Sequence, residues 1–239
     1  MKIVSRNTYS ITGKKGGFKM DSIKIKSLFD LDHTILKSYL EGFDYPWEAL
    51  NSLSKTIIDL GNQLDLNEYK KIKENVWAHK TAKIYPSAYI DGPTIICEGA
   101  EIRHSAFIRG SALIGAHAVV GNSCEIKNSI LMDYASAPHF NYIGDSILGY
   151  KAHMGAGAVT SNLKQDKSLV VIHSKVFEMK TGMKKVGAFL GDFVEVGCNS
   201  VLNPGTVIGK NSNIYPLSNV RGVINENKIY KQGILVEKR

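Results

Sequence analysis

Residues 136–145, SAPHFNYIGD, bring together side chains that can move a proton and bind a polar ligand. The imidazole of His139 can be neutral near pH 7 and can then accept a proton from a reacting group. Tyr142 follows three residues later, in what we expect to be the same strand, and its phenol can donate a hydrogen bond. Earlier in the chain, Arg109 offers two parallel donors that suit a phosphate, and Lys127 adds a second positive charge. These residue types predict a site for an anionic ligand beside a general base.

Each of these residues also has a structural interpretation. A surface histidine is most often solvated, and Arg109 and Lys127 could belong to an ordinary solvated face of the protein. Glu125 could hold the second ring nitrogen of His139 and set its tautomer, or it could only pair with Lys127. We expect structural or exposed positions for four other histidines, His104, His117, His153 and His173.

The candidates lie in a sequence with a six-residue period. An aliphatic residue recurs every six positions from Ile84 to Ile126, and a small residue lies two positions before each. A helix of 3.6 residues per turn cannot keep such a stripe on one side. A triangular coil can, because each flat face takes about six residues and three faces close one turn. The period therefore predicts a parallel β-helix with the aliphatic side chains inside.

A second run with the same period extends from Leu190 to Val220, out of phase with the first. The step from Ile126 to Leu148 is 22 residues, which is not a multiple of six. We interpret the break as a slip in the register of the coil that turns His139 outward. The inside positions of a closed coil are aliphatic, and a buried imidazole there would need a partner to offset its desolvation.

The period divides the chain into segments. Residues 20–75 have apolar residues at three- and four-residue spacings, which predict a short helical region. The β-helix is expected over 76–225, with an inserted loop at about 161–187 where the period is absent. Residues 226–239 are interpreted as a C-terminal strand or arm. Both terminal segments are expected to cap the open ends of the coil.

Composition and charge narrow the possible functions. The net charge of +8 falls to +3 without residues 1–19, which hold five basic residues and no acidic one. We interpret residues 1–19 as a leader that need not be native, with translation starting at Met20. The mildly basic remainder suits small anionic ligands better than nucleic acid, and no stretch is apolar for long enough to span a bilayer. Three cysteines without metal-ligand spacing predict buried, reduced thiols in a cytoplasmic protein: Cys97, Cys124 and Cys198.

A resemblance to a known family rests on three stretches: RGSALIGAHAVVGNSCEIKNSILMDYASAPHFNYIGDSILG, GAGAVTSNLK and GAFLGDFVEVGCNSVLNPGTVIG. They resemble the acetyltransferase half of the bifunctional enzymes that make UDP-N-acetylglucosamine, and the archaeal sugar-1-phosphate nucleotidylyltransferases with an acetyltransferase tail. The resemblance covers roughly residues 76–222. It implies an all-β, left-handed parallel β-helix that assembles as a homotrimer with its active sites between subunits. The H-x-N-Y-x-G-D block is the most specific part.

The resemblance also implies an activity. An acetyl group would pass from acetyl-CoA, the co-substrate, to the amine of an amino-sugar 1-phosphate similar to glucosamine 1-phosphate, without a metal, a nucleic acid or a membrane. The implied site residues are His139, Glu125 and Tyr142 for catalysis; Arg109, Lys127, Tyr142 and Asn162 for the sugar phosphate; and Gly155, Ala156, Gly157 and Cys198 for acetyl-CoA. The backbone N–H groups of residues 155–157 are expected to face the thioester carbonyl.

Two classes of function remain open. The first is a sugar-amine N-acetyltransferase, which the complete H-x-N-Y block favours. The second is a non-catalytic β-helix subunit that assembles with or regulates a separate nucleotidyltransferase. His153, where the family usually has asparagine, and the poor alignment of the lysines after Asn162 favour this second class. The sequence contains no Gly-rich nucleotidyltransferase loop, so we expect that half of the bifunctional enzymes to be absent.

Overall fold

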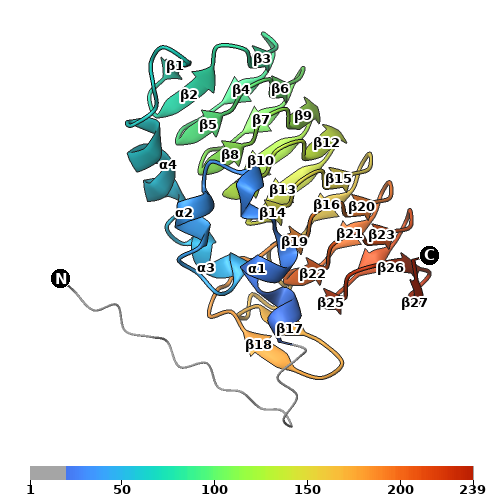
Figure 1. Cartoon of the computed structure of the whole chain (residues 1–239). Helices are drawn as coiled ribbons and strands as arrows, with labels where there is room; N and C mark the ends of the chain where they lie inside the picture. Colours follow the sequence, from blue (N-terminus) through green and yellow to red (C-terminus); the bar gives the residue numbers. More distant parts are fainter. Residues whose placement is uncertain (1–19, 239) are drawn as a thin grey trace, which may run out of the picture.

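Short strands wound into a three-sided coil make up most of the protein, and the computed structural model describes residues 20–238 (Figure 1). Residues 1–19, interpreted above as a leader, lie outside the described residues. Each side of the coil is one sheet, which we call face A, face B or face C. Neighbouring strands of a face are parallel, except at the two ends of the coil. There β1 is antiparallel to β2, and β26 is antiparallel to β27.

Face A contains β1 (Tyr69–Lys73), β2 (Val76–His79), β5 (Thr94–Ile96), β8 (Ala112–Ile114), β11 (Ser129–Leu131), β14 (Ile147–Leu148), β19 (Ala188–Leu190), β22 (Thr206–Ile208) and β25 (Val223–Ile224). Face B contains β3 (Lys83–Ile84), β6 (Glu101–Ile102), β9 (Val119–Asn122), β12 (Ser136–His139), β15 (His153–Met154), β20 (Glu195–Val196), β23 (Asn213–Ile214), β26 (Lys228–Lys231) and β27 (Ile234–Glu237). Face C contains β4 (Tyr89–Ile90), β7 (Phe107–Ile108), β10 (Glu125–Lys127), β13 (Tyr142–Gly144), β16 (Val159–Thr160), β21 (Val201–Leu202) and β24 (Asn219–Val220).

The aliphatic residues of the six-residue period fill the inside of the coil. Ile102, Ile108 and Ile114 are fully buried there, and so are Leu190 and Leu202 from the second run. The fold is a left-handed parallel β-helix of about nine turns, which confirms the expected all-β class.

Two short corners account for the break in the period. The successive inward side chains are Ile126, Leu131, Ala137, Ile143 and Leu148, all fully buried. The first and last steps of this series are five residues long, while the two middle steps keep the six-residue length. Each five-residue step crosses the corner from face C to face A. The coil thus loses one residue at each of two corners.

The slip does not occur at His139, so our interpretation of the break is wrong on this point. His139 ends strand β12, inside the stretch that keeps the six-residue step, and it reaches the surface at an ordinary corner. The shortened corners are turned by Asn128 and Asp145, whose φ angles of 48° and 50° lie in the left-handed region. Asn and Asp visit this region more readily than most residues because their short polar side chains hydrogen-bond locally.

Short helices and a hairpin cover face A (Figure 1). The helices are η1 (Asp21–Ile23), α1 (Ile25–Leu28), η2 (Leu31–His33), α2 (Lys37–Leu40), α3 (Pro46–Leu50) and α4 (Leu53–Gly61), and the hairpin is β17 (Val171–His173) with β18 (Glu178–Lys180). Face A points a second row of buried apolar side chains outward, Ile95, Leu113, Ile130, Ile147, Phe189 and Val207. Trp47, Leu53 and Ile57 of the helices and Ile172 of the hairpin pack in the same cluster.

The helical region therefore lies along one side of the coil, and the expectation that it caps an open end is wrong. The outward apolar row of face A explains the difference, because it offers the helices more surface to bury than the end of the coil does. None of the helices within residues 20–238 is long and apolar enough to cross a membrane. The polar candidate residues lie on faces B and C and at their corners.

Candidate active site

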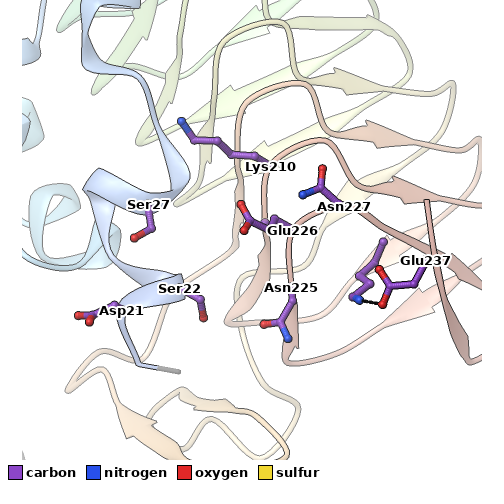
Figure 2. Close-up of a pocket in the computed structure, with 10 residues that line it drawn as sticks. Asp21, Ser22, Ser27, Lys210, Asn225, Glu226, Asn227 and Glu237 are labelled. Atoms are coloured by element: carbon purple, nitrogen blue, oxygen red, sulfur yellow. Dashed lines mark hydrogen bonds and ion pairs between the residues drawn. The ribbon is translucent and has the colours of Figure 1, made fainter. Parts of the chain in front are cut away.

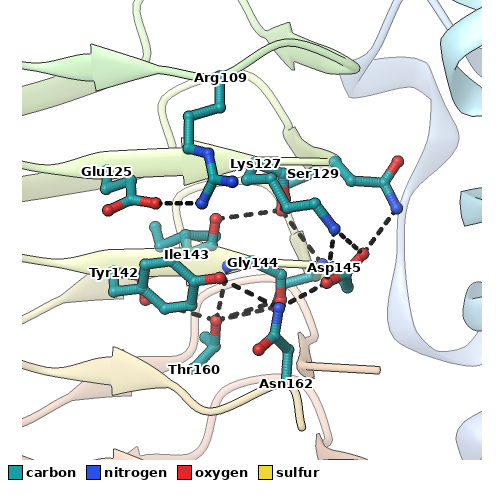
Figure 3. Close-up of polar contacts among 12 residues, drawn as sticks. Arg109, Glu125, Lys127, Ser129, Tyr142, Ile143, Gly144, Asp145, Thr160 and Asn162 are labelled. Atoms are coloured by element: carbon teal, nitrogen blue, oxygen red, sulfur yellow. Dashed lines mark hydrogen bonds and ion pairs between the residues drawn. The ribbon is translucent and has the colours of Figure 1, made fainter. Parts of the chain in front are cut away.

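Five of the candidate residues stack on face C and its corner with face A (Figure 3). Arg109 directly follows β7, Glu125 and Lys127 lie on β10, and Tyr142 begins β13. Asn162 comes shortly after β16, the next strand of the face. Since the strands are parallel and in register, residues about one turn apart in the sequence become neighbours across the face. The repeat itself thus assembles this polar cluster.

Asp145 holds the cluster together. Its side chain is only 4% exposed, and Lys127 Nζ lies 2.9 Å from its Oδ1. Asn128 Nδ2 donates to the same oxygen at 2.8 Å, and Asn162 Nδ2 donates to Oδ2 at 2.6 Å. A buried carboxylate requires such donors, because burial without them costs several kcal/mol (roughly 3–5 for a broken pair). Asp145 ends the H-x-N-Y-x-G-D block, but no role was predicted for its side chain from the sequence.

The ring of Tyr142 lies over Gly144, toward Asn162 (Figure 3). A Cβ atom at Gly144 would stand 2.4 Å from Tyr142 Oη and 2.8 Å from Asn162 Nδ2, so only glycine leaves room for both groups. Asn162 Nδ2 donates to Tyr142 Oη at 3.1 Å. Burial raises the pKa of the Tyr142 phenol, which therefore stays protonated near neutral pH and can donate to a ligand.

Arg109 is paired with Glu125, with Nη1 2.7 Å from Oε1 and both side chains substantially exposed. The hydrogen bond to Glu125 raises the pKa of Arg109 further, so the guanidinium remains charged. Neither of the two partners expected for Glu125 is found: Lys127 pairs with Asp145 instead. Glu125 lies opposite Tyr142 in the register of β10 and β13.

His139 lies at the corner between faces B and C, at the end of β12. It is exposed, and its ring makes no hydrogen bond or ion pair with any other residue between 20 and 238. Tyr142 belongs to β13 on face C, so the expectation that both residues share a strand is wrong. The corner between them is turned by Phe140, with φ 52° and a side chain 62% exposed. The imidazole is thus open to a ligand on either side of the corner.

Asn141, inside the same block, has a structural role that the sequence analysis missed. Its side chain is buried, and Nδ2 donates to the backbone carbonyls of Gly155 at 2.8 Å and Ala158 at 3.0 Å. Its Oδ1 accepts from the backbone N–H of His139 at 3.2 Å. Asn141 therefore fixes the backbone of His139 to the next turn of the coil.

A groove of about 340 Å³ opens on face B, beginning one strand beyond His139. His153, Gly155, Glu195, Cys198 and Tyr215 are among its lining residues. The structure thus brings together two of the residues expected to meet acetyl-CoA, and it adds His153. Cys198 is exposed, so the expectation of three buried thiols is wrong for this one and right for the other two cysteines.

The turn formed by residues 155–157 does not present all of its amides to a ligand. The N–H of Gly155 donates to Val196 O at 2.7 Å, and that of Gly157 donates to His139 O at 3.0 Å. Only the Ala156 amide has no hydrogen-bond acceptor among the described residues of the chain. The expectation that this turn faces a thioester carbonyl with several donors is therefore wrong, and one donor remains.

A larger hollow of about 640 Å³ lies between the first helical turns and the last turns of the coil (Figure 2). It is lined by polar residues, including Asp21, Lys210 and Glu226, and by none of the candidate site residues. Lys210 is tied to Asp192 at 2.8 Å. Within residues 20–238 there is no group of three or more His, Cys, Asp and Glu side chains that could hold a metal ion.

Comparison with known proteins gives this geometry a context. Residues 72–181 match the family described as the GMPPB C-terminal domain. The chain is 30% identical over 201 residues to a bifunctional sugar-1-phosphate nucleotidylyltransferase/acetyltransferase of Sulfurisphaera tokodaii, covering 80% of this chain and 49% of the relative. It is 33% identical over 206 residues to the bifunctional protein GlmU of Methanococcus maripaludis, covering 84% and 49%. The chain is homologous to the C-terminal part of these proteins.

This homology confirms the resemblance found in the sequence. The chain spans about half the length of the curated relatives it matches. Among solved structures, the acetyltransferase domain of PglB from Neisseria gonorrhoeae is similar over 75% of this chain and 62% of its own length. That similarity has 14% identity and a TM-score of 0.33.

Proposed function

We propose that this protein transfers an acetyl group from acetyl-CoA to the amine of an amino-sugar 1-phosphate. The observation that carries the proposal is the convergence of Lys127 and Asn162 on Asp145, with Tyr142 bonded to Asn162 and Arg109 on the same face. The description of one relative names an acetyltransferase activity together with a sugar-1-phosphate nucleotidylyltransferase activity.

The phosphate of the acceptor suits the cationic edge of face C. Arg109 has N–H groups beyond the one that binds Glu125, and Glu125 is exposed enough to be displaced by a phosphate. Lys127 is held by the buried Asp145, and its side chain remains 27% exposed. The phenol of Tyr142 would donate to a sugar or phosphate oxygen, and Asn162 would help to fix the orientation of that phenol.

Acetyl transfer from a thioester to an amine needs a base for the amine proton and a donor for the developing oxyanion. We assign His139 as the base, because its ring is exposed and bonded to no described residue. The free amide of Ala156 is the proposed donor to the thioester oxygen. The amine nitrogen then bonds to the acetyl carbon, its proton passes to the His139 ring, and the CoA thiolate leaves.

The groove on face B is the proposed site for the pantetheine arm of acetyl-CoA. It begins one strand beyond His139 and includes Gly155, whose lack of a side chain lets a ligand approach the backbone. Val196 and Ile214 add apolar surface, which suits the thioester end of the arm. Gly157 and Cys198 flank the free amide of Ala156 and complete this part of the site.

We extend the proposal to assembly and context. Faces B and C are each open on one side, and a site between them is completed most simply by a second copy of the chain, so we propose a homotrimer with shared sites. We also propose a role in forming nucleotide sugars such as UDP-N-acetylglucosamine. The buried, unpaired thiols of Cys97 and Cys124 favour a reducing compartment, which supports a cytoplasmic location.

A non-catalytic subunit is the second candidate, and one observation favours it. Both cations of the polar cluster around Asp145 are paired within the chain, Arg109 with Glu125 and Lys127 with Asp145. Such a surface is electrically balanced without a ligand and could serve only to hold a partner.

Release of free thiol from acetyl-CoA distinguishes the two candidates. The purified chain would be incubated with acetyl-CoA and, separately, glucosamine 1-phosphate, galactosamine 1-phosphate, glucosamine 6-phosphate or glucosamine. We expect thiol release with an amino-sugar 1-phosphate well above that with the free sugar. No release with any of the four acceptors, from protein that circular dichroism shows to be folded, would contradict the acetyltransferase and support the subunit.

A further inference from the structure

Two exposed aromatic rings extend the polar cluster of face C toward the N-terminal end of the coil. Tyr89 on β4 is 56% exposed and Phe107 on β7 is 38% exposed. Their ring centroids are 5.8 Å apart, at an interplanar angle of 61°. A contiguous exposed apolar patch rimmed by polar residues is a feature of ligand-binding surfaces, and these two adjacent rings form such a patch.

These rings are in line with the proposed acceptor site. The register of face C runs Tyr89, Phe107, Glu125 and Tyr142, each on the next strand. Neighbouring strands are about 4.8 Å apart, so Phe107 lies roughly 10 Å from the Tyr142 strand. A ribose and a diphosphate together can span this distance between Phe107 and the Tyr142 strand. Arg109 lies two residues beyond Phe107 on the same side of the face, where it can meet the phosphates.

Two cations lie beside the rings, and each is paired with a carboxylate, Lys73 with Asp91 and Arg109 with Glu125. Lys73 Nζ is 4.7 Å from the centroid of the Tyr89 ring and 2.6 Å from Asp91 Oδ1. Together with Arg109 it supplies cations along the edge of the face that the aromatic column borders. Flat rings beside cations are the combination that binds nucleotides, since a base can stack on a ring while its phosphates meet the cations.

We propose that Tyr89 and Phe107 form a nucleobase subsite, so that face C also binds the nucleoside diphosphate-linked form of the amino sugar, in addition to the amino-sugar 1-phosphate of the proposed function. The base would stack on Phe107 or Tyr89, and the diphosphate would extend past Arg109 toward Lys127. The sugar would then lie near Tyr142 and the corner that bears His139. The sugar end of this arrangement rests on the proposed function, while the base subsite rests on the rings and the cations.

Binding of uridine 5′-diphosphate to the full chain, compared with inorganic pyrophosphate, tests the proposal by calorimetry. We expect the nucleotide to bind about tenfold more tightly than pyrophosphate, the scale of one stacked base. Phe107→Leu and Tyr89→Leu remove a flat ring but keep an apolar side chain. At least one of them should weaken nucleotide binding about fivefold or more while changing pyrophosphate binding little. Phe193→Leu is the matched control, since Phe193 is also exposed (44%) but lies away from face C.

Three results would overturn the subsite. The nucleotide could bind no more tightly than pyrophosphate, or both ring variants could bind it as the wild type does. The third is a loss of assembled mass in light scattering for Phe107→Leu without weaker nucleotide binding, which would make the rings a contact between copies. If the nucleotide binds as expected but thiol release from acetyl-CoA is absent, the proposed function fails while the subsite stands.

Discussion

Asp145 illustrates how a buried carboxylate can organise a site without contacting the reacting atoms. It accepts from Lys127, Asn128 and Asn162, and two of these three were candidates for the ligand site on other grounds. Its negative charge both fixes the Lys127 ammonium and directs the Asn162 amide toward Tyr142. We therefore regard Asp145 as a positioning residue.

The variant Asp145→Asn keeps the shape of the side chain and removes its charge. We expect the KM for the amino-sugar 1-phosphate to rise about tenfold, with a smaller change in kcat, because Lys127, the lysine proposed to bind the phosphate, loses its anchor. Steady-state kinetics with varied acceptor measure this split. Asp59→Asn, in the exposed pair with Lys55 on α4, is the control and should leave both constants unchanged. Equal loss of kcat and kcat/KM would contradict a positioning role.

The three cysteines differ in burial, and the exposed thiol should be alkylated faster than the two buried ones. Burial raises the pKa of the Cys97 thiol to about 12 and also raises that of Cys124, whereas Cys198 is exposed on the face B groove. Because the thiolate is the reactive form, iodoacetamide at pH 8 should alkylate Cys198 in the folded protein and spare the other two until unfolding. Peptide mass spectrometry reads the sites, and fast labelling of Cys97 would contradict the fold around it.

Much of the cluster could be predicted from residue types alone. The remaining roles depend on contacts between turns of the coil, which residue types do not specify. His139, Arg109 and Lys127 were predicted because an imidazole and cations are useful to an anionic substrate. The roles of Asp145 and Asn141 depend on which backbone atoms and side chains lie one turn away, and no single-residue property encodes that. Glu125 was assigned the wrong partner for the same reason, since its neighbour across face C is a residue of another turn.

At the scale of elements, the six-residue period predicts the inside of the coil but not its cover. The cover has its own signal, a second apolar residue directly before the inward one, as in Leu113-Ile114 and Phe189-Leu190. This pair recurs in every turn of face A, but pairs such as Phe107-Ile108 and Val201-Leu202 on face C also fit it, so the signal does not single out the covered face by itself. The short corners were also hard to predict, because a lost residue at Asn128 and another at Asp145 together resemble one large slip.

The outward row of face A should contribute much of the stability. Leu113 is fully buried between face A and the helices, and Leu113→Ala should lower the free energy of unfolding by about 2–5 kcal/mol. Leu66, which is 69% exposed, provides the matched control. Leu66→Ala should change the free energy of unfolding by less than about 0.5 kcal/mol. Denaturant titration followed by circular dichroism measures both. Similar small changes for the two variants would show that the helices do not pack on this face.

At the scale of the whole molecule, covering one face decides where chemistry can occur. With face A buried under the helices, a ligand or another subunit can approach only faces B and C and the corner between them, where His139 and Phe140 are exposed. The groove on face B, proposed for acetyl-CoA, and the cluster on face C, proposed for the acceptor, then lie on the two sides of that corner. Assembly through the same two faces would enclose each site.

Light scattering of the purified chain at micromolar concentration should therefore give the mass of a trimer. In a closed ring of three copies, one surface of each copy contacts a different surface of the next copy. Faces B and C, which are both uncovered and share a corner, could supply these two surfaces. A monomeric mass would contradict the shared sites and would leave the corner at His139 exposed to water on all sides.

The central claim is that His139 is the base for acetyl transfer to an acceptor held on face C, and the kinetics of His139→Ala test it most directly. Both enzymes would be assayed by thiol release at saturating acetyl-CoA with varied amino-sugar 1-phosphate. We predict that kcat falls roughly 10²–10⁴-fold, the usual contribution of a general base, while the acceptor KM and the melting temperature stay close to those of the wild type. A wild-type kcat for His139→Ala would contradict the claim and direct the search for the base to His153 in the face B groove.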